Sequence, residues 1–389
     1  MKILMLTTQL GYGGAETSFI RLANCLAQSM DVTIALFTNT GTYSAGHAPL
    51  DAKVHVTLLD TASSNQFVRW WRRIRTFRSL KQQHDVAISF LSGPNMVNVL
   101  AGKNARSIIS IRGSRKYDPV SSCAQRWLFH YVIDPIIYLL AGAIVPVSDG
   151  LRQEIPSYAQ SRIHVISPFI EPLAIAERLN EPLPQAYAAL RNQKVIVAVG
   201  RLSVEKGFHH LIRVFSALSK REAGIKLLLV GDGPMLQSLR TQCSDLALAT
   251  DDMSPAQNAV IFAGYQKNVL PFIALGRVLA LTSATEGFPN VLLEAMAAGV
   301  PIIAADTPWG ARAILHKHDT SKGPYPTHRI THTDYGTLMP RIDDINHQHM
   351  WVDALAQALE QPHAPNCSAR VTDFSLETVG ASWKLLVEN

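Results

Sequence analysis

Short apolar runs of strand length alternate along the chain with longer amphipathic segments. In the first half these runs are residues 2–8, 31–38, 53–59, 86–91, 107–111 and 143–148. The alternation then restarts, with runs at residues 194–200, 225–232, 259–264, 277–283 and 301–306. Apolar strands separated by helices are typical of parallel sheets covered by helices. The pattern therefore predicts an α/β fold class with two successive sheets.

The periodicity lapses in a segment rich in Pro and Glu, residues 166–185. We therefore expect the boundary between two Rossmann-like domains near residue 170. In such sheets ligands bind outside the carboxyl ends of the strands, which predicts an active site in a cleft between the domains. The final segment, 374–389, is expected to be helical, and its apolar side chains need a surface to pack on.

Composition agrees with a globular protein of two domains. The chain has 389 residues, 47% of them hydrophobic and 17% charged, which excludes disorder. A net charge of +6 suits an anionic ligand or a negatively charged lipid surface. The four cysteines form no CxxC pair, so neither a zinc ribbon nor a disulfide framework is predicted, and a reducing compartment fits best.

Two apolar stretches have features of targeting or membrane segments. The opening residues 1–11 lead into glycines without a cleavage site, so we interpret them as the first strand. Residues 127–147 are interrupted by His130, Asp134 and Pro135, which disfavours a spanning helix. A buried helix followed by a strand is the prediction for this stretch.

Glycines follow the first apolar run in the sequence GYGGAE, residues 11–16. Gly13 and Gly14 would let the backbone turn tightly and approach a ligand, and the following helix would offer its free N–H groups to an anion. The cluster does not match GxGxxG, because position 16 is Glu. A ligand contact and a purely structural turn both remain open.

A second cluster, GRLSVEKGF, follows the first strand of the second half. Arg201 and Lys206 bracket a short loop that enters a helix, so two cations and a helix N-terminus could converge on one anion. A diphosphate is the ligand that this arrangement favours. The alternative is a pair of surface cations at a helix start.

The third cluster, TEGFPNVLLEAMAAG, spaces two glutamates eight positions apart. Glu286 precedes a helix opened by Pro289 and Asn290, and Glu294 is expected in its first turn, so both carboxylates can face one cavity. Paired carboxylates could also indicate a glycosidase, but the nearby cations argue for a phosphate leaving group. A helix cap with a solvated Glu is the other alternative.

These motifs, with VPVSDGL at 145–151 and VGDGP at 230–234, resemble the retaining glycosyltransferases of family 4, also called glycosyl transferases group 1. The resemblance implies a GT-B fold, with two Rossmann-like domains facing across a cleft. It implies an acceptor-side domain of residues 1–170 plus 372–389, to which the final helix returns. Residues 171–371 would form the domain that binds a nucleotide sugar.

The resemblance also implies roles for single residues. Glu294 would bind the ribose and Glu286 the transferred sugar, while Arg201 and Lys206 would neutralise the departing diphosphate as catalytic groups. Gly13 and Gly14 would close over the phosphates or face the acceptor. The remaining donor-binding positions would be Gly287, Phe288, Pro289, Asn290 and Val291.

Arg112 stands where many relatives carry His. A guanidinium cannot act as a base at neutral pH, so we expect Arg112 to bind phosphate or an anionic acceptor. The family works without a metal, and this chain has no D-x-D motif, so no metal or cofactor is predicted. A UDP-sugar is the favoured donor and a GDP-sugar the alternative.

The implied activity is transfer of a hexose or N-acetylhexosamine, with retention, to a glycan acceptor in surface-polysaccharide biosynthesis. A glycan linked to lipid is the expected acceptor. The leaving phosphate would take the acceptor's proton, and electrostatic stabilisation would dominate the rate. The alternatives are a sugar-nucleotide epimerase of similar architecture and a non-catalytic protein that binds nucleotides or glycans.

Residues 67–81, FVRWWRRIRTFRSLK, combine apolar and basic positions at helical spacing. Such a helix can lie at an anionic membrane surface, which predicts a peripheral enzyme on the cytoplasmic face. The predicted membrane contacts are Trp70, Trp71, Arg72, Arg73 and Arg75. An ordinary amphipathic domain helix is the alternative, and nucleic-acid binding is not expected because no binding module is present.

A polar insertion at residues 316–334 contains four histidines, His316, His318, His328 and His332. Their spacing fits no metal template, so a solvated loop is predicted there.

Overall fold

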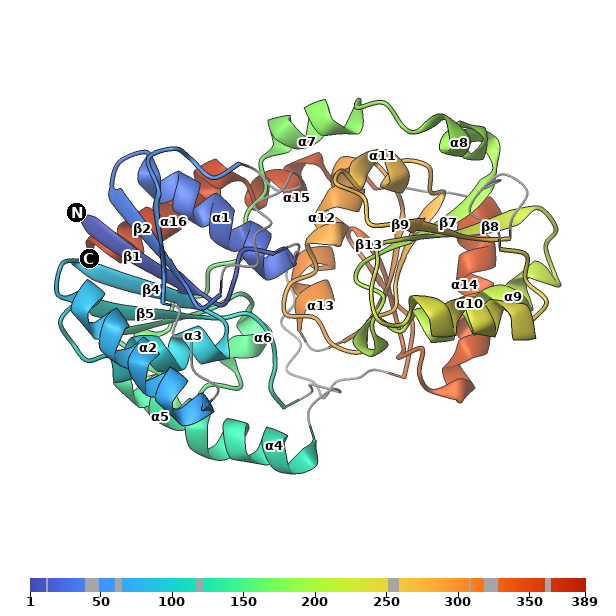
Figure 1. Ribbon diagram of the computed structural model, residues 1–389. Coiled ribbons are helices and arrows are strands. Elements are labelled where there is room, and N and C mark those ends of the chain that lie inside the picture. The colour runs from blue at the N-terminus through green and yellow to red at the C-terminus, as the bar shows by residue number, and fades with distance from the viewer. Residues whose placement is uncertain are drawn as a thin grey trace. The chain divides into compact units, whose positions relative to one another are not determined.

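A computed structural model describes residues 1–11, 13–38, 49–59, 65–116, 122–250, 259–307, 309–317, 328–360 and 365–389. The chain divides into two compact units, coloured along the chain in Figure 1. The first unit is Met1–Phe169 with Phe374–Asn389, and the second is Ile170–Asp373.

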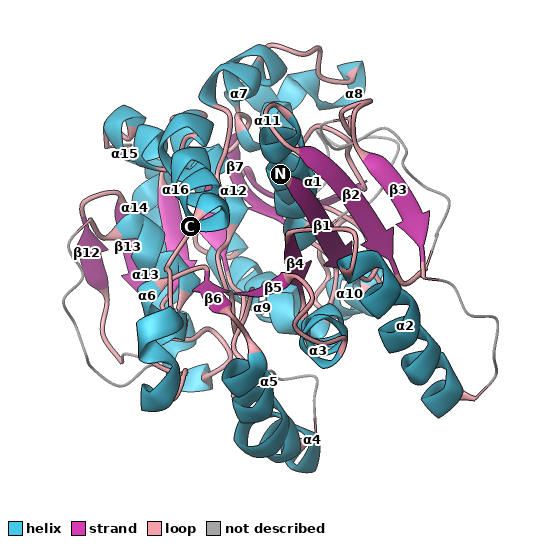
Figure 2. Cartoon of the chain, turned by 90° about the vertical axis from the view of Figure 1, so that its left-hand side faces the viewer, coloured by secondary structure: helices cyan, strands magenta, loops and turns pink. Residues whose placement is uncertain are grey.

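The first unit contains a parallel sheet of six strands in the order β3-β2-β1-β4-β5-β6 (Figure 2). The strands are β1 (Lys2–Thr7), β2 (Asp31–Leu36), β3 (His55–Leu58), β4 (Val86–Phe90), β5 (Arg106–Ile111) and β6 (Ala143–Pro146). Met5 of β1 pairs with Ile34 on one side and Ile88 on the other. The strand order reverses between β1 and β4, which makes this pair the switch point of the sheet.

Helices cover both faces of this sheet because successive side chains of a strand point to opposite faces. Ile3 and Met5 pack with α1 (Gly14–Ala27) and α16 (Leu376–Glu388), whereas Leu4 and Leu6 pack with α2 (Gln66–Lys81) and α3 (Ser92–Leu100). The other helical segments of the unit are α4 (Cys123–Leu128), the π-helix η1 (Phe129–Ile133), α5 (Asp134–Leu140), α6 (Asp149–Arg152) and the 3₁₀-helix η2 (Ser157–Arg162).

The last helix, α16, belongs to the first unit although it is the end of the chain. Trp383 is 2% exposed and its ring lies 6.3 Å from that of Phe90. The Arg106 guanidinium donates a 2.6 Å hydrogen bond to the Leu386 carbonyl. Burial of the apolar side of α16 is what holds the two ends of the chain in one unit.

The second unit contains a sheet of seven strands in the order β12-β13-β11-β10-β7-β8-β9. The strands are β7 (Lys194–Val199), β8 (Ile225–Val230), β9 (Val260–Gly264), β10 (Val278–Leu281), β11 (Ile302–Ala305), β12 (Thr331–Thr333) and β13 (Gly336–Met339). All pairs are parallel except the hairpin of β12 and β13. Part of the predicted loop 316–334 is therefore an edge strand, which pairs with β13, whose Leu338 and Met339 are fully buried.

The helices of the second unit surround this sheet. They are α7 (Pro172–Leu179), α8 (Gln185–Ala188), η3 (Ala189–Asn192), η4 (Val204–Lys206), α9 (Phe208–Ser219), α10 (Leu236–Asp245), α11 (Leu270–Ile273), α12 (Asn290–Ala297), α13 (Gly310–Leu315), η6 (Ile345–His347), α14 (Gln348–Glu360) and α15 (Ser368–Asp373). The fully buried Trp351 of α14 packs in the core beside the sheet, and its indole N–H donates to the Pro340 carbonyl at 2.8 Å.

The prediction of two parallel α/β sheets is confirmed, and each apolar run forms a strand. The prediction of a buried helix after Trp127 is wrong in one respect. The inner side of this segment is buried, but Trp127 and Tyr131 are each 60% exposed because nothing in the described chain covers the outer side. None of the helices in the described ranges has the length and apolar content needed to cross a bilayer.

Candidate active site

Two loops at the carboxyl edge of the second sheet are bonded to each other. The loop after β7 contains η4, and the loop after β10 leads to α12. The Thr282 hydroxyl donates to the Lys206 carbonyl at 2.8 Å, and the Ala284 N–H donates to the Glu205 carbonyl at 2.7 Å. Gly207 has a φ of +70°, and a Cβ there would lie 2.4 Å from the Thr282 carbonyl oxygen. Glycine is therefore required for this close approach.

Lys206 and Glu286 form an ion pair at the point where these loops meet. The Lys206 ammonium donates to Glu286 Oε1 at 2.6 Å, and the Ser283 hydroxyl donates to the same oxygen at 2.6 Å. The side chains are 25% and 13% exposed, so both stay accessible to a ligand. No described residue donates to Glu286 Oε2, which leaves this oxygen available to a hydroxyl group.

The backbone of Glu286 is held as firmly as its side chain. Its carbonyl accepts the N–H groups of Trp309 and Gly310, both at 3.1 Å. A Cβ at position 310 would come within 2.6 Å of Pro289 Cδ and 2.9 Å of the Gly287 carbonyl. The start of α13 thus packs directly on the segment that joins Glu286 to α12.

Arg201 lies in the loop after β7, in the same loop as Lys206, and is exposed. Its carbonyl accepts hydrogen bonds from the N–H and the hydroxyl of Ser203. Within the described part of the chain its guanidinium has no ion-pair partner, whereas the charge of Lys206 is balanced by Glu286. The loop also contains Glu205, whose carboxylate accepts a hydrogen bond from the Ser203 hydroxyl at 2.6 Å.

Helix α12 begins where the sequence predicts it. Pro289 is the N-cap and Asn290 the first helical residue, which places Glu294 in the second turn and not in the first. The buried Asn290 Oδ1 has no hydrogen-bond partner among the described residues. Gly287, Phe288, Asn290 and Val291 are partly exposed, whereas Pro289 between them is buried.

The position of these loops in the sheet agrees with a ligand site. β7 pairs with β8 on one side and with β10 on the other, so the strand order reverses between β7 and β10. In open α/β sheets the crevice at such a reversal is where ligands bind. The Lys206–Glu286 pair lies in the two loops that follow these strands.

The first unit has a cavity of about 420 Å³ at the carboxyl ends of β4 and β5. Arg112 lines it and stacks over the Phe90 ring at 4.6 Å. Burial lowers the Arg112 pKa to about 9, although the nearby Glu16 carboxylate acts to raise it. Glu16 belongs to the GGAE segment, so this segment and Arg112 are neighbours. Within the segment, a Cβ on Gly13, the N-cap of α1, would meet the Glu16 carboxylate at 2.2 Å. Gly14 is the first residue of α1.

Sequence reasoning missed the acidic groups of this cavity. Asp134 is buried, and burial raises its pKa to about 6, an effect that Arg115 opposes. The Ser114 hydroxyl donates to both oxygens of Glu154, at 2.6 and 2.9 Å. Leu91, also in the lining, has a φ of +74°, which is strained for a residue with a branched side chain. No spacing in the sequence links residues 91, 112, 134 and 154; only the fold does.

Among the described residues, one group of three side chains has the geometry to share a metal ion: His328, Asp344 and His347. His328 Nδ1 lies 3.3 Å from His347 Nε2, and the other His347 nitrogen lies 3.2 Å from the Arg341 carbonyl. His316 is instead near Asp334 and His332 near Thr337. His318 lies outside the described residues.

The structure corrects part of the predicted membrane contact on α2. Arg73 is buried and stacks over the Phe37 ring at 4.2 Å, and Trp70 packs edge-to-face on the same ring. These two side chains serve the core of the first unit, because they lie on the side of α2 that faces the sheet. Trp71, Arg72 and Arg75 are exposed.

Comparisons with known proteins agree with this architecture. Residues 193–325 match the model of the family described as Glycosyl transferases group 1. An N-acetyl-D-galactosaminyltransferase of Campylobacter jejuni, named for a PP-undecaprenol-linked acceptor, is 25% identical over 100% of this chain and 99% of its own. An uncharacterised glycosyltransferase of Methanocaldococcus jannaschii is 29% identical over 54% of this chain, which spans about half (53%) of that relative's length.

Among solved structures, the Anabaena protein HepE in complex with UDP and glucose has a TM-score of 0.74 and 17% identity, and the alignment covers 100% of this chain and 99% of that one. Two α/β units with parallel sheets of this kind define the GT-B fold, which the chain adopts. The predicted resemblance to the group 1 glycosyltransferases is confirmed by the family match of residues 193–325 and by the similarity to the Campylobacter transferase.

Proposed function

We propose that the chain transfers a hexose or N-acetylhexosamine, with retention, from a nucleotide-diphosphate sugar to a lipid-linked glycan. A UDP-sugar is the favoured donor, and surface-polysaccharide assembly at the cytoplasmic face of a membrane is the proposed setting. The observation that supports this most strongly is the Lys206–Glu286 ion pair, in which a cation and a carboxylate lie together and both remain accessible to a ligand.

In this proposal the second unit binds the donor. Arg201 and Lys206 neutralise the diphosphate, Glu286 accepts hydrogen bonds from the transferred sugar, and Glu294 from the ribose. The free N–H groups at the start of α12 and the surface from Gly287 to Val291 complete the site. Lys206 would exchange part of its contact with Glu286 for the phosphate, so donor binding would free the Glu286 carboxylate for sugar hydroxyls.

The chemical step breaks the bond between the anomeric carbon and the diphosphate oxygen and forms one to an acceptor oxygen. The acceptor's proton passes to the departing phosphate, so the chain needs no base of its own. Arg201 and Lys206 stabilise the charge that develops on the leaving group, which is the kind of interaction that contributes most to catalysis. No step requires a metal, because two cations already face the diphosphate.

Names of relatives support the substrate classes. The Campylobacter relative is named for an acceptor linked to PP-undecaprenol, and the HepE structure contains UDP and glucose. The cavity of the first unit, with Arg112 and Arg115 in its lining, is the proposed site for an anionic acceptor. Gly13 and Gly14 would contact phosphate or acceptor beside it.

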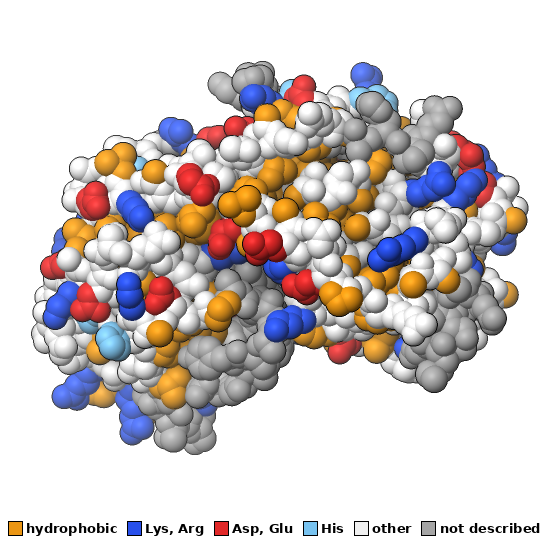
Figure 3. Space-filling view, turned by 90° about the horizontal axis from the view of Figure 1, so that it is seen from above, with side chains coloured by type: hydrophobic (Ala, Val, Ile, Leu, Met, Phe, Trp, Pro, Cys, Tyr) orange, Lys and Arg blue, Asp and Glu red, His pale blue; other side chains and the backbone are white. Residues whose placement is uncertain are grey.

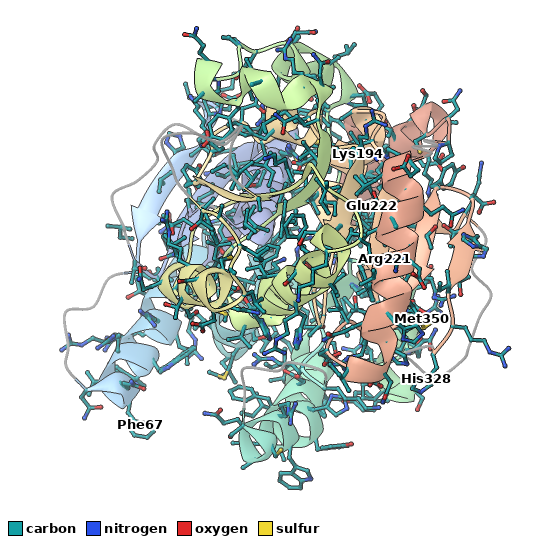
Figure 4. All side chains as sticks on the ribbon, turned by 90° about the vertical axis from the view of Figure 1, so that its right-hand side faces the viewer. Phe67, Lys194, Arg221, Glu222, His328 and Met350 are labelled. Atoms are coloured by element: carbon teal, nitrogen blue, oxygen red, sulfur yellow. The ribbon has the colours of Figure 1, made fainter. Side chains whose placement is uncertain are left out.

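The test is a Glu286→Gln variant of the full chain. A thermal-shift screen of UDP- and GDP-sugars first identifies the donor, because a ligand that binds the folded state raises the unfolding temperature, and a tighter ligand raises it more. We then expect Glu286→Gln to lower kcat/KM for that donor by about 10²- to 10³-fold. The matched control is Glu360→Gln, which breaks another Lys–Glu pair of the same unit, Lys194–Glu360, at an exposed position; Lys194 is labelled in Figure 4. Full activity of Glu286→Gln would refute the proposed role.

A further inference from the structure

The segment formed by α4, η1 and α5 exposes a row of large apolar side chains. Trp127, Tyr131, Ile136 and Leu139 are 60%, 60%, 51% and 63% exposed. Leu128, Val132 and Leu140 flank this row and are 44%, 38% and 37% exposed. We call these seven residues the apolar stripe. Contiguous apolar surfaces of this kind are rare on soluble monomers and indicate an interaction site.

The backbone keeps the apolar stripe on one side of the segment. Most of its members follow one another at intervals of four residues. In a regular α-helix, each such interval rotates the side chain by roughly 40° around the helix axis relative to the one before it. A turn of the π-helix Phe129–Ile133 contains more residues than an α-helical turn, so the rotation between members of the row is smaller there. A π-helix inside an α-helix is also frequently found at functional sites.

The apolar stripe does not contribute to the core of the first unit, because the opposite side of the same segment packs there. Ile137 and Tyr138 are 4% and 8% exposed and belong to a core cluster with β5 and β6. Phe129 lies under the Arg115 guanidinium at 4.5 Å. His130, Asp134, Ile137 and Tyr138 form one wall of the cavity that also contains Arg112. The segment thus has an acceptor cavity on one side and bare apolar surface on the other.

Charge at the same end of the first unit indicates what covers the apolar stripe. On α2, Phe67 is 85% and Trp71 58% exposed, and Arg72 and Arg75 are exposed next to them. The Arg78 guanidinium is instead bonded to the carbonyls of Leu100 and Ala101. Helix α3 packs against both α2 and α5. The free end of α2, where Phe67 points away from the ribbon, and the α4–α5 segment lie at the same lower end of the first unit in Figures 1, 2 and 4.

Neither element exposes a carboxylate. Residues 66–81 contain no Asp or Glu, and the one acidic residue of 122–140, Asp134, is 6% exposed. Acidic and basic side chains are mixed on the face that Figure 3 shows. Exposed Trp, Tyr and aliphatic side chains beside unopposed arginines match the interface of an anionic bilayer, where rings lie at headgroup depth and cations near phosphates.

We propose that the apolar stripe inserts into the interfacial layer of an anionic lipid bilayer and that the exposed arginines of α2 contact the lipid phosphates. The biological purpose of this binding rests on the proposed function, because a first unit bound to a bilayer would meet a lipid-linked acceptor at the membrane. Vesicle binding is measured without donor or acceptor, so its failure and a failure of sugar transfer are distinguishable.

The native cysteines allow a direct measurement. Cys123, at the start of α4, is exposed, whereas Cys25, Cys243 and Cys367 are buried. An environment-sensitive fluorophore on Cys123 of the full chain should shift its emission to the blue when vesicles of phosphatidylethanolamine and phosphatidylglycerol are added. The protein should also float with these vesicles in a density gradient.

Two sets of variants separate the apolar from the electrostatic contribution. Serine at positions 127, 131, 136 and 139 together should lower vesicle partitioning by at least about tenfold at both low and high salt, because the lost contribution is apolar. Arg72→Glu with Arg75→Glu should weaken binding at low salt and much less at high salt. The control is Leu173→Ser with Ile345→Ser, which removes side chains that are 83% and 70% exposed in the second unit and should leave binding unchanged.

Each outcome decides the proposal. An unchanged unfolding temperature and donor-induced thermal shift in the serine variant show that a loss of binding is not a loss of folding. Vesicle binding by the serine variant equal to that of the parent chain would overturn the inference, as would absence of binding by the parent chain. A parent chain that is dimeric on gel filtration and becomes monomeric on serine substitution would assign the apolar stripe to a second copy instead.

Discussion

At the scale of single residues, the candidate site is defined by how charges are balanced before any ligand binds. Lys206 and Glu286 compensate each other, and Ser283 holds the shared carboxylate oxygen from the other side. A partly buried ion pair is held in place by its neighbours and loses little side-chain entropy when a ligand arrives. In the proposed function, Arg201, which is exposed in the same loop, supplies positive charge that attracts a diphosphate.

Asp134 gives a pH-dependent prediction at the same scale. Its folded-state pKa, raised to about 6, exceeds the value near 3.8 of the unfolded chain, so the folded state retains a proton that the unfolded state has released. The associated stability is fully present below about pH 4 and is lost as the pH rises through about 6. We expect Asp134→Asn, which cannot ionise, to unfold with a free energy about 3 kcal/mol above that of the parent chain at pH 8.

The measurement is the unfolding free energy of the first unit between pH 4 and pH 8. The difference in unfolding free energy between Asp134→Asn and the parent chain should shrink toward zero at the acidic end of this range, because the parent carboxyl group is then neutral as well. Asp149→Asn, a substitution at an exposed position, should show no such slope. A difference that is the same at every pH would show that the buried charge of Asp134 is not its source.

At the scale of elements, the site depends on the close packing of the loops after β7 and β10. Gly207 allows η4 to approach the end of β10, and the bonds from Thr282 and Ala284 lock it there. Lys206 immediately precedes this glycine, so the position of its ammonium depends on the approach. A displaced loop would separate Lys206 from Glu286.

A comparison of two glycines with the same backbone conformation separates the effect of this packing from the effect of backbone strain. Gly207 and Gly299 have φ values of +70° and +69°, but a Cβ at 299 would meet nothing within 4 Å. Gly299→Ala should cost about 1 kcal/mol of stability, the strain of a left-handed residue alone. Gly207→Ala should cost about 1 to 3 kcal/mol more, because it overpacks the loop, and should weaken donor binding.

Chemical denaturation of the second unit and titration with the donor check both effects. Equal losses of stability in the two variants would contradict the proposed packing. Unaltered donor affinity in Gly207→Ala would show that the loop does not position Lys206.

At the scale of the whole molecule, the sequence was sufficient for the fold because buried strands and covering helices leave distinct hydrophobic periods. The motif order likewise led to the family whose model matches residues 193–325. The β12–β13 hairpin was missed, since an edge strand such as Thr331–Thr333 has one bonded neighbour and little apolar content. The roles of the candidate site residues stay predictions.

Other features depend on three-dimensional neighbours that no local pattern records. The apolar residues of 127–140 predict a helix, but periodicity does not tell which side remains uncovered. The cavity that joins Arg112 to Asp134 requires the β5 and α5 segments to be adjacent. The partition of α2 into a buried Arg73 and an exposed Arg72 follows from the position of Phe37, a residue on another strand's loop.

The most direct test of the central claim is hydrogen exchange of the full chain, resolved by peptide, with and without the nucleotide sugar that the thermal-shift screen selects. Binding of the diphosphate and sugar at the Lys206–Glu286 pair should slow exchange in peptides covering residues 200–208 and 283–294. Protection confined to other segments, with these two unchanged, would contradict the assignment of the donor site.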